Sequence, residues 1–501
     1  MNRVSTPVRT ALLAGAGLLL VQLGWILSVI PGFGIDEFDH ALRASSVAAG
    51  HWEPGHDLVT GKAGRGDLIP VRSDVARTIA PACKARSYTG PYNCTPKTDL
   101  GDGTVLIASA ASRYNPVFYA YAGTLAKPFG GQANLLAMRV ATALAACVLF
   151  MLTVWLAVSG ARTRWPLVGC LVAALPTTVY STAIASPNGI EMIAGLGFWV
   201  AALALVRGPR GAQRRASAYA IAGLCAATTA NTHTLGMLWL GLIVTAVALL
   251  HGPGRTVRAL LPVTRLERAV AAATALAISF ELVWLLVSGA NDPTQEHTVF
   301  RGNPVPYTLT GALLWPLQAI GAFPMRDENA PMALYALALL VLGLIATLTV
   351  RRLALRSRTA LTLAFVASVS WLVPAVLTVY SFHQIGSAWQ GRYGMPFSVG
   401  LIVVAAAVLD DSSRPPRRSR ALVTLCVVAV TLTQLIGQLG VVAGEHRHTE
   451  LVHAAGWHSP PVLLLVVLAL GAGLCWYAGV RVSEPAPSDE AAESSRELVV
   501  A

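Results

Sequence analysis

The sequence is dominated by long apolar runs that alternate with short polar segments. A helix needs about 20 mainly apolar residues to cross the roughly 30 Å hydrocarbon core of a bilayer. About twelve runs meet or approach this length, at residues 10–30, 133–158, 166–185, 190–206, 217–232, 234–250, 269–288, 331–350, 360–380, 393–409, 421–441 and 460–480. The chain is therefore predicted to be an all-α polytopic membrane protein.

The charge content and its distribution agree with this class. Only 12% of the residues are charged, whereas soluble domains carry about a quarter. The net charge of +12 comes mainly from short arginine clusters between the apolar runs. Nucleic-acid binding would instead need one continuous basic face with interleaved aromatic residues. We therefore expect membrane lipid as a partner and no nucleic acid.

The arginine clusters also predict the topology, because membrane proteins concentrate arginine in cytoplasmic loops. The clusters near residues 162, 210, 260, 355 and 417 occupy every second connection. Both termini are thus predicted to be cytoplasmic, in the plasma membrane of a bacterium. The predicted organisation is one transmembrane domain over residues 1–480, with a large extracytoplasmic loop at 31–132, a second extracytoplasmic segment at 289–330 that includes an interfacial or re-entrant helix at 307–323, and a disordered cytoplasmic tail at 481–501.

Two of the seven cysteines lie in the large loop, and the other five lie in apolar runs. Since disulfides persist outside the cytoplasm, a bridge between Cys83 and Cys94 is predicted. A metal site is the alternative, but CxxC spacing and a nearby histidine are both absent.

The polar residues that could carry chemistry gather at the predicted outer face, beginning with residues 34–50 after the first span. Helical character from Glu37 to Ala49 would place Glu37, His40 and Arg43 on one face. In one interpretation the acids only begin a solvated helix, where the helix dipole favours them. In the other, Asp36, Glu37 and His40 are catalytic residues, acting as a general base or holding a divalent cation, and Arg43 contacts substrate.

Two further stretches supply candidate substrate-binding residues. Tyr114 and Asn115 open the aromatic stretch 112–130, which is predicted to be a helix lying at the interface. Asn188 lies in a short outer turn at 186–189, and Glu191 follows just inside the next span. A turn with a helix cap explains most of this second stretch, but an acid inside the membrane is costly and usually functional.

The fourth stretch, residues 383–397, contains Gln390, Arg392 and Tyr393 where an outer loop enters a span. A lone outer arginine can simply reach lipid headgroups. An arginine at the mouth of a cavity, however, suits a phosphate, which it can hold with two parallel hydrogen bonds. Nucleotide-binding and hydrolase motifs are absent, so the sequence does not support ATP-driven transport by this chain alone.

Taken in order, the four stretches resemble a bacterial family of multi-pass membrane proteins, domain of unknown function 2142. The matching elements are PGFGIDEFDHALRA at 31–44, YNPVFY at 114–119, ASPNG at 185–189 and QGRYGMP at 390–396. The resemblance covers roughly residues 20–410. The chain departs from the family pattern at Asn188, where many members have aspartate, so a role that needs a carboxylate there passes to Glu191.

The family is in turn distantly similar to the GT-C superfamily, which takes sugars from polyprenyl-phosphate donors at the outer leaflet. The resemblance implies a GT-C-like fold, Asp36 or Glu37 as catalytic base or metal ligand, and Arg392 as a ligand of the lipid phosphate. It leads to the expectation that Asp36→Asn and Glu37→Gln abolish transfer without lowering the folded yield. A transporter or flippase, or a structural partner in an envelope complex, are the alternative functions that the residues leave open.

Overall fold

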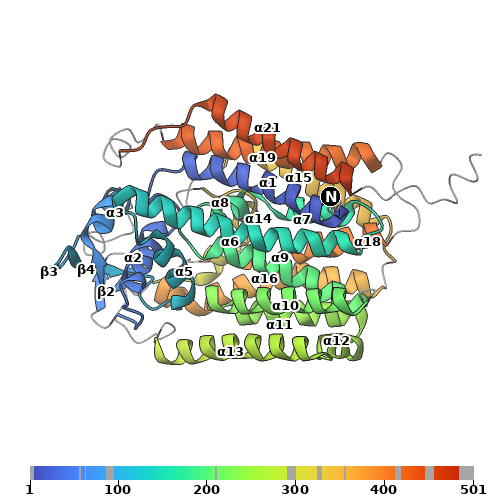
Figure 1. Cartoon of the computed structure of the whole chain (residues 1–501), viewed down its shortest axis with the longest axis horizontal. Helices are drawn as coiled ribbons and strands as arrows, with labels where there is room; N and C mark the ends of the chain where they lie inside the picture. Colours follow the sequence, from blue (N-terminus) through green and yellow to red (C-terminus); the bar gives the residue numbers. More distant parts are fainter. Residues whose placement is uncertain are drawn as a thin grey trace, which may run out of the picture.

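The structure is a computed structural model that describes residues 5–55, 58–61, 64–85, 95–208, 211–289, 301–323, 330–354, 357–386, 389–411, 419–445 and 456–483. Long helices run side by side, and a small group of strands and short helices lies at one end of them (Figure 1). We call this end, which carries β1–β4, the sheet end. The opposite end, which carries α7, α12 and the end of α18, is called the arginine end.

The helices account for most of the described chain. The longer ones are α1 (Thr6–Ser28), α6 (Gly131–Ser159), α9 (Asn188–Arg207), α10 (Ala212–Thr232), α11 (Gly236–His251), α13 (Arg265–Val287), α14 (Pro304–Ile320), α15 (Met332–Val350), α16 (Arg358–Ile385), α19 (Ser419–Glu445) and α21 (Val462–Val482). The shorter ones are α2 (Glu37–Ala48), α3 (Ser73–Ala85), α5 (Pro116–Ala126), α7 (Trp165–Ala173), α8 (Pro176–Thr182), α12 (Pro253–Leu260), η1 (Gly391–Gly394), α17 (Met395–Ser398) and α18 (Gly400–Asp410).

Within the described residues, nine helices are long and apolar enough to cross a membrane. They are α1, α6, α9, α13, α15, α16, the continuous segment Gly391–Asp410, α19 and α21. The predicted all-α polytopic fold is confirmed, and the protein is a multi-pass membrane protein. Helices α2 and α5 also form close to where the sequence placed them.

The predicted number of twelve spans is not confirmed, because three of the predicted runs fall short. The run at 166–185 is divided into α7 and α8, since Leu175 is extended and the Pro176 ring cannot continue a helix from before it. The run at 217–232 lies in α10, which has 21 residues but carries too many polar ones. The run at 234–250 forms α11, whose 16 residues are fewer than a perpendicular span needs.

The large loop predicted at 31–132 contains a sheet that the sequence analysis did not predict. Its antiparallel strands lie in the order β1-β2-β4-β3, with bounds β1 Leu58–Gly61, β2 Gly64–Arg72, β3 Thr98–Gly101 and β4 Thr104–Ser109. Ile69 pairs with Ile107 and Val71 with Val105, so four buried apolar side chains share one face. This face packs against α2 and α3, which fixes α2 at the sheet end of the bundle.

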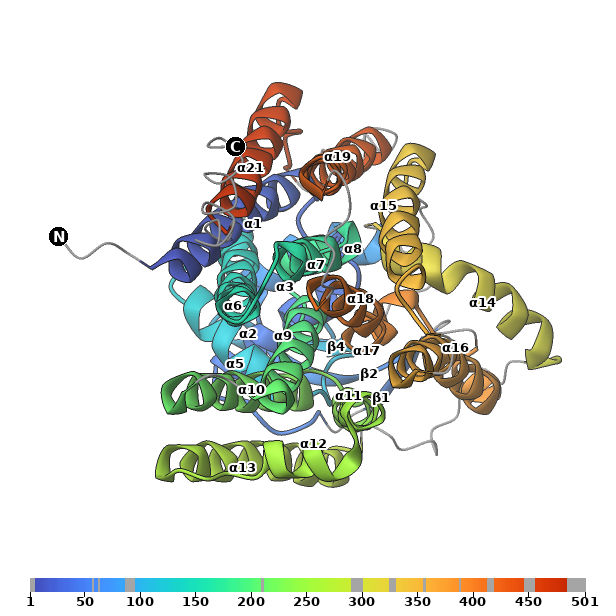
Figure 2. The same ribbon diagram turned by 90° about the vertical axis from the view of Figure 1, so that its right-hand side faces the viewer.

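Helix α9 lies in the middle of the bundle and α13 at its edge (Figure 2). In the most apolar stretch of α9, 94% of the residues are buried, whereas in that of α13 only 6% are buried. Large apolar side chains of α13, such as Leu276 and Leu286, are exposed as expected for a surface that faces lipid. A functional residue on α9 would therefore lie inside the protein.

Several predictions fall on residues outside the described ranges. Cys94 is one of them, so the predicted bridge to Cys83, which is buried in α3, stays a prediction. Residues 290–300 and 324–329 of the second extracytoplasmic segment and residues 484–501 of the tail also lie outside. Between them, α14 has 17 residues with Pro316 inside it, and its interfacial or re-entrant placement stays a prediction.

Candidate functional site

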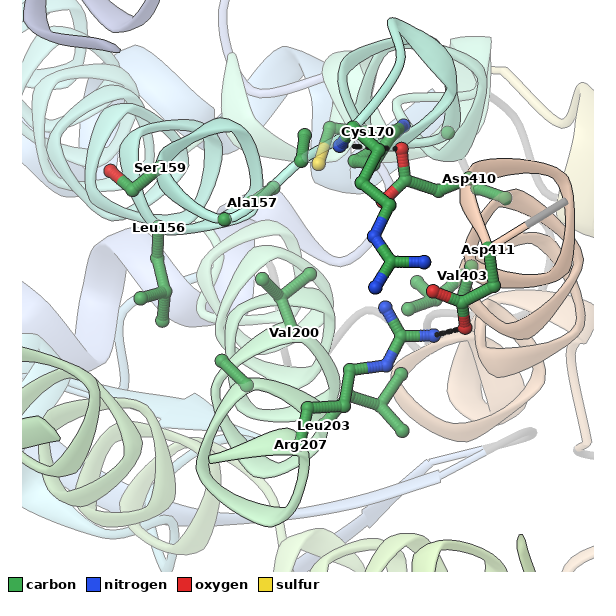
Figure 3. Close-up of a pocket in the computed structure, with 18 of the residues that line it drawn as sticks. Leu156, Ala157, Ser159, Cys170, Val200, Leu203, Arg207, Val403, Asp410 and Asp411 are labelled. Atoms are coloured by element: carbon green, nitrogen blue, oxygen red, sulfur yellow. Dashed lines mark hydrogen bonds and ion pairs between the residues drawn. The ribbon is translucent and has the colours of Figure 1, made fainter. Parts of the chain in front are cut away.

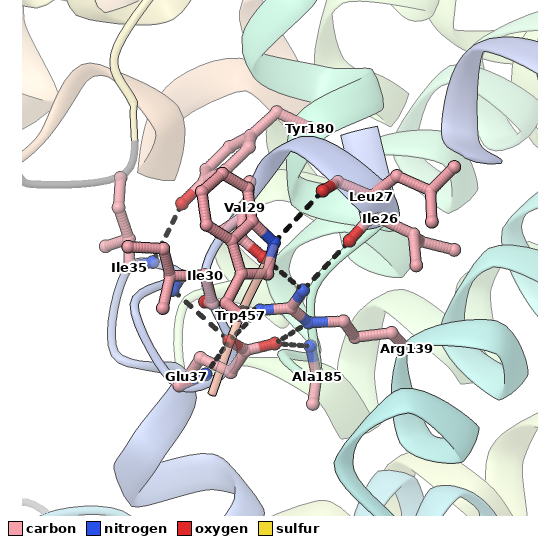
Figure 4. Close-up of polar contacts among 12 residues, drawn as sticks. Ile26, Leu27, Val29, Ile30, Ile35, Glu37, Arg139, Tyr180, Ala185 and Trp457 are labelled. Atoms are coloured by element: carbon pink, nitrogen blue, oxygen red, sulfur yellow. Dashed lines mark hydrogen bonds and ion pairs between the residues drawn. The ribbon is translucent and has the colours of Figure 1, made fainter. Parts of the chain in front are cut away.

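Arg139 of α6 fastens the end of α1 to the start of α2 (Figure 4). Its Nη1 atom donates to the carbonyl oxygens of Ile26 at 3.1 Å and Val29 at 2.8 Å, and its Nη2 atom to that of Ile30 at 2.9 Å. Carbonyls at a helix C-terminus have no intrahelical donor left. Because the Arg139 side chain is buried, its guanidinium takes the place that water has at an exposed helix end.

The same guanidinium forms a two-point ion pair with Glu37. Nε lies 2.7 Å from Oε1 and Nη2 lies 2.6 Å from Oε2. The carboxylate also accepts from the backbone nitrogens of Gly32, Gly34 and Ala185, at 3.0, 3.2 and 2.9 Å. Burial alone would raise the pKa of Glu37, but the Arg139 charge and these hydrogen bonds hold that pKa below its ordinary value. Glu37 is thus an ionised group whose interactions are all made within the protein.

Asp36, the neighbouring acid, faces a different environment. Its backbone is in the left-handed region, with φ 57° and ψ 9°, which aspartate tolerates better than most residues. The turn is held on one side by the Ile35 nitrogen, which donates to Tyr180 Oη at 2.9 Å, and on the other by buried Glu37. The Asp36 carboxylate accepts a hydrogen bond from Arg392 Nη2. Its side chain is 33% exposed, whereas that of Glu37 is 0% exposed, so only Asp36 can meet a substrate.

Arg392 lies in η1 and is 3% exposed. Its Nη2 atom donates to Asp36 and, at 3.4 Å, to Tyr393 Oη. Its Nε and Nη1 atoms are buried and find no partner among the residues that the structure describes. Unused donors of a buried charge carry a desolvation cost, which an anion with several oxygens would remove. The Asp36–Arg392 pair therefore presents a carboxylate that can accept a proton and two donors that can bind an anion.

The η1 turn that carries Arg392 lies against α14. The Gly391 nitrogen donates to Gln318 Oε1 at 2.9 Å. A Cβ atom on residue 391 would lie 2.0 Å from the Trp315 carbonyl oxygen, so only glycine allows the two backbones to approach this closely.

An apolar cavity of about 380 Å³ adjoins this turn. Gly391, Gly394 and Met395 form its wall next to Arg392, and it extends between α14, α15, α16 and α18. Trp315 and Trp389 also line it, with ring centroids 6.5 Å apart. A volume of this size is in the range of small-ligand pockets, so the cavity can hold part of an apolar chain.

Aromatic and imidazole rings form two groups near Asp36 and Arg392, one around His40 and one around Tyr393. His40 Nδ1 lies 2.8 Å from Tyr119 Oη, and the His40 ring lies 5.9 Å from that of Tyr114. On the far side, the His233 ring lies 5.4 Å from that of Tyr393. His40 and Tyr114 both interact electrostatically with Asp36 and Arg392, and Tyr114 also with Tyr393, so these predicted residues belong to one polar region.

A small cavity of about 30 Å³, with several polar residues in its lining, borders this region. Tyr114, Asn115, Asn188, His233 and Glu281 line it. Asn115 Nδ2 donates to Glu281 and, at 3.0 Å, to Asn231 Oδ1. The cavity has room for about one water molecule, so Asn115 and Asn188 lie where they could orient a polar group of a substrate.

Three predicted substrate-binding residues, Arg43, Glu191 and Gln390, make no hydrogen bond or ion pair with Asp36 or Arg392 in the described part of the chain. Arg43 donates to the backbone carbonyls of His51, Trp52 and Glu53, and burial lowers its pKa to about 10. Glu191 is buried on α9, and its Oε1 atom has no partner within the described ranges. Gln390 is buried and immediately precedes η1.

The suggested divalent cation would need a set of ligands near Asp36 and Glu37. In the described part of the chain there is no group of three or more His, Cys, Asp or Glu side chains placed to hold a metal ion. Glu37, moreover, is already neutralised by Arg139 at 2.6 Å. We therefore derive no step through a metal.

The site should make stability depend on pH through His40. Burial lowers the pKa of His40 from 6.5 to about 4. Below pH 6.5 the unfolded chain takes up a proton that the folded chain refuses, so stability falls as the pH drops from 6.5 towards 4. The full loss would be about 3 kcal/mol. Melting curves of the purified protein should show this loss, and His40→Gln should flatten it; an equal pH dependence in the variant would contradict the assignment.

Two residues of the site were not predicted from the sequence, although each carried a signal. Arg139 is a lone arginine near the outer end of an apolar run, where charged residues are rare and functional. His233 is a histidine in a short outer turn. Both lie outside the four stretches, and Arg139 lies 102 positions from Glu37, so their spatial relation to Asp36 could not be read from spacing.

Comparison with known proteins gives one family. The model of the family described as "Predicted membrane protein (DUF2142)" matches residues 19–401. No curated protein matches the sequence.

Solved structures of similar fold come from two organisms. ArnT from Cupriavidus metallidurans in the apo state has 13% identity and a TM-score of 0.42, over 88% of this chain and 75% of that one. The same protein bound to undecaprenyl phosphate has 14% identity and a TM-score of 0.42, over 93% and 76%. The oligosaccharyltransferase of Archaeoglobus fulgidus in the apo form has 11% identity and a TM-score of 0.37, over 96% and 56%. At these identities and TM-scores we draw no functional argument from the likeness.

Proposed function

The chain belongs to the DUF2142 family of predicted membrane proteins, and from the geometry around Asp36 and Arg392 we propose that it is a membrane glycosyltransferase. In this proposal it moves a sugar from a polyprenyl-phosphate donor to an envelope acceptor at the outer leaflet of a bacterial plasma membrane. The sheet end then faces outward, because the arginine-rich connections lie at the other end.

The observation that carries the proposal is the position of Arg392. Its side chain has two unused donors, and its neighbours in the chain, Gly391 and Gly394, line an apolar cavity of about 380 Å³. A polyprenyl phosphate has the matching chemistry, a charged phosphate at the end of an apolar chain. The cavity accommodates the first isoprene units, and Arg392 Nε and Nη1 donate hydrogen bonds to the phosphate oxygens. The remainder of the polyprenyl chain lies in the surrounding membrane lipid.

The reaction needs one proton acceptor and one leaving group. The Asp36 carboxylate takes the proton of the acceptor hydroxyl, whose oxygen forms a bond to the anomeric carbon of the sugar. The bond between that carbon and the phosphate oxygen breaks, and the phosphate keeps the electron pair. Arg392 stabilises the charge that develops there. Its hydrogen bond to Asp36 also orients that carboxylate.

A transporter or flippase would use the same charges differently, along a path through the bundle. The interior around α9 is closely packed, since 94% of the residues in its most apolar stretch are buried. Trp199 of α9 is fully buried, and its Nε1 atom donates to the Phe397 carbonyl oxygen at 3.1 Å. This packing favours a site that is open at one face, and it therefore supports the transferase over the transporter.

Native mass spectrometry of the purified protein with undecaprenyl phosphate tests the proposal. We expect wild type to retain the lipid. Arg392→Ala should retain less of it, by roughly a factor of ten or more, because charge-assisted hydrogen bonds are lost. Arg258→Ala, an exposed arginine of α12 at the arginine end, is the matched control. If wild type retains no lipid, or if wild type, Arg392→Ala and Arg258→Ala retain equal amounts, the proposal of a lipid-linked donor is contradicted.

A further inference from the structure

A second polar cavity lies at the arginine end, remote from Asp36 and Arg392. Its volume is about 440 Å³, and it lies between the ends of α6, α7, α9 and α18. Figure 3 shows Arg207, Asp410 and Asp411 around one space, with apolar Val200, Leu203 and Val403 deeper in its wall. The proposed transfer reaction uses none of these residues.

The two aspartates of this cavity are not equivalent. Asp410 is buried, and its Oδ1 atom accepts from the nitrogens of Arg162 and Thr163 and from Thr163 Oγ1, at 3.0, 2.7 and 2.8 Å. It therefore holds the α6–α7 connection against the end of α18. Asp411 pairs with Arg207 at 2.7 Å, with 54% and 33% of the two side chains exposed. An ion pair this exposed is weak and easily exchanged.

The cations exceed what these acids neutralise. Arg162, Arg207 and Arg214 line the cavity from three different segments of the chain. The guanidinium groups of Arg162 and Arg214 make no hydrogen bond or ion pair with the part of the chain that the structure describes. His251, which also lines the cavity, has a buried Nε2 atom without a partner there.

We propose that this cavity is a binding site for a phosphate group. Three guanidinium groups can surround a phosphate, which offers several acceptor oxygens and up to two negative charges. Asp411 occupies Arg207 when the site is empty and is displaced when phosphate binds. The apolar wall gives the site room for what the phosphate is attached to.

The phosphate can come from an anionic phospholipid or from a soluble compound. Basic pockets between helices on the cytoplasmic side are the usual places for anionic headgroups, and the positive-inside rule puts this end on that side. A free phosphate would reach the same side chains from the cytoplasm. The recognising groups are the same, so the test must separate the two sources.

The test uses the full chain in detergent, with Arg392→Ala as the background so that the outer phosphate site is not counted. Titration calorimetry with inorganic phosphate is one measurement, and native mass spectrometry with phosphatidylglycerol against phosphatidylcholine is the other. We expect Arg162→Gln combined with Arg207→Gln to weaken binding roughly tenfold or more. We expect Asp411→Asn to strengthen it, because the competing carboxylate charge is gone. Arg258→Gln, which removes an arginine outside the cavity, should leave it unchanged.

Binding of inorganic phosphate that follows this order of variants supports a soluble phosphate ligand. Preference for phosphatidylglycerol that follows the same order, without binding of inorganic phosphate, supports a lipid headgroup. Binding that is unaffected by the double arginine change, or no binding of either probe, overturns the proposal. Because the outer site is removed in the background, none of these outcomes depends on the glycosyltransferase proposal.

Discussion

Arg139→Met is expected to leave little folded protein. The change removes five hydrogen bonds, two of which belong to the ion pair with Glu37, and it leaves the Glu37 carboxylate charged and buried. Breaking a buried ion pair by removing one partner costs about 3–5 kcal/mol. The net stability of a folded domain is only about 5–15 kcal/mol. The yield of monodisperse protein after size-exclusion chromatography and its melting temperature measure the effect.

Two comparisons make this prediction specific. Arg207→Met makes the same substitution in an exposed ion pair, so it should lower the free energy of unfolding by at most about 1 kcal/mol. Arg139→Met combined with Glu37→Gln should recover part of the loss, because no uncompensated charge is left. A melting temperature of Arg139→Met equal to that of wild type would show that Glu37 is not a buried, ionised partner of Arg139.

The same geometry changes what we expect of Glu37. From the sequence, Glu37→Gln was expected to abolish transfer while leaving the folded yield intact. The structure encloses the Glu37 carboxylate among Arg139 and three backbone nitrogens, so Glu37→Gln should lower the folded yield itself. Glu37 is then a positioning residue, which holds the turn that presents Asp36.

The sequence could predict the spans and the polar face because both depend on local pattern. Long apolar runs specify helices in a bilayer whatever their neighbours are, and α2 at Glu37–Ala48 follows from its own residues. Asp36, His40, Tyr114 and Arg392 could be singled out because polar residues near the end of an apolar run are conspicuous. That Asp36 and Arg392 touch, although 356 positions apart, was not visible in either stretch.

The separate roles of Asp36 and Glu37 could not be predicted for a physical reason. The two acids are adjacent, and nothing in their composition favours one as the buried partner. The choice is made by the left-handed backbone at Asp36 and by Arg139, which lies 102 positions from Glu37. The sheet of residues 58–109 was missed for a different reason, since two of its strands, β1 and β3, have only four residues each and carry little pattern.

Asp36→Asn is expected to abolish sugar transfer while leaving the protein folded and able to bind its lipid donor. Asparagine keeps the size of the side chain and an oxygen that can accept from Arg392, but it cannot take a proton. General-base catalysis contributes about 10²–10⁴-fold to a reaction rate, so the turnover should fall by that factor. Wild type and Asp36→Asn would each be expressed in a strain from which the native gene has been deleted. Mass spectrometry would then measure the amounts of sugar-loaded lipid and of envelope glycan.

The matched control for this change is Asp39→Asn, three residues further along α2. Asp39 is also buried, but its Oδ1 atom accepts from the Ala110 nitrogen at 2.8 Å on the side of the sheet. Asparagine can keep that bond, so Asp39→Asn should retain transfer. Accumulation of sugar-loaded lipid in Asp36→Asn alone, with lipid binding lost only in Arg392→Ala, would separate the proton acceptor from the phosphate ligand. If Asp36→Asn turns over like wild type, Asp36 is not the base, and the carboxylate of Glu281 beside Asn115 becomes the next residue to test.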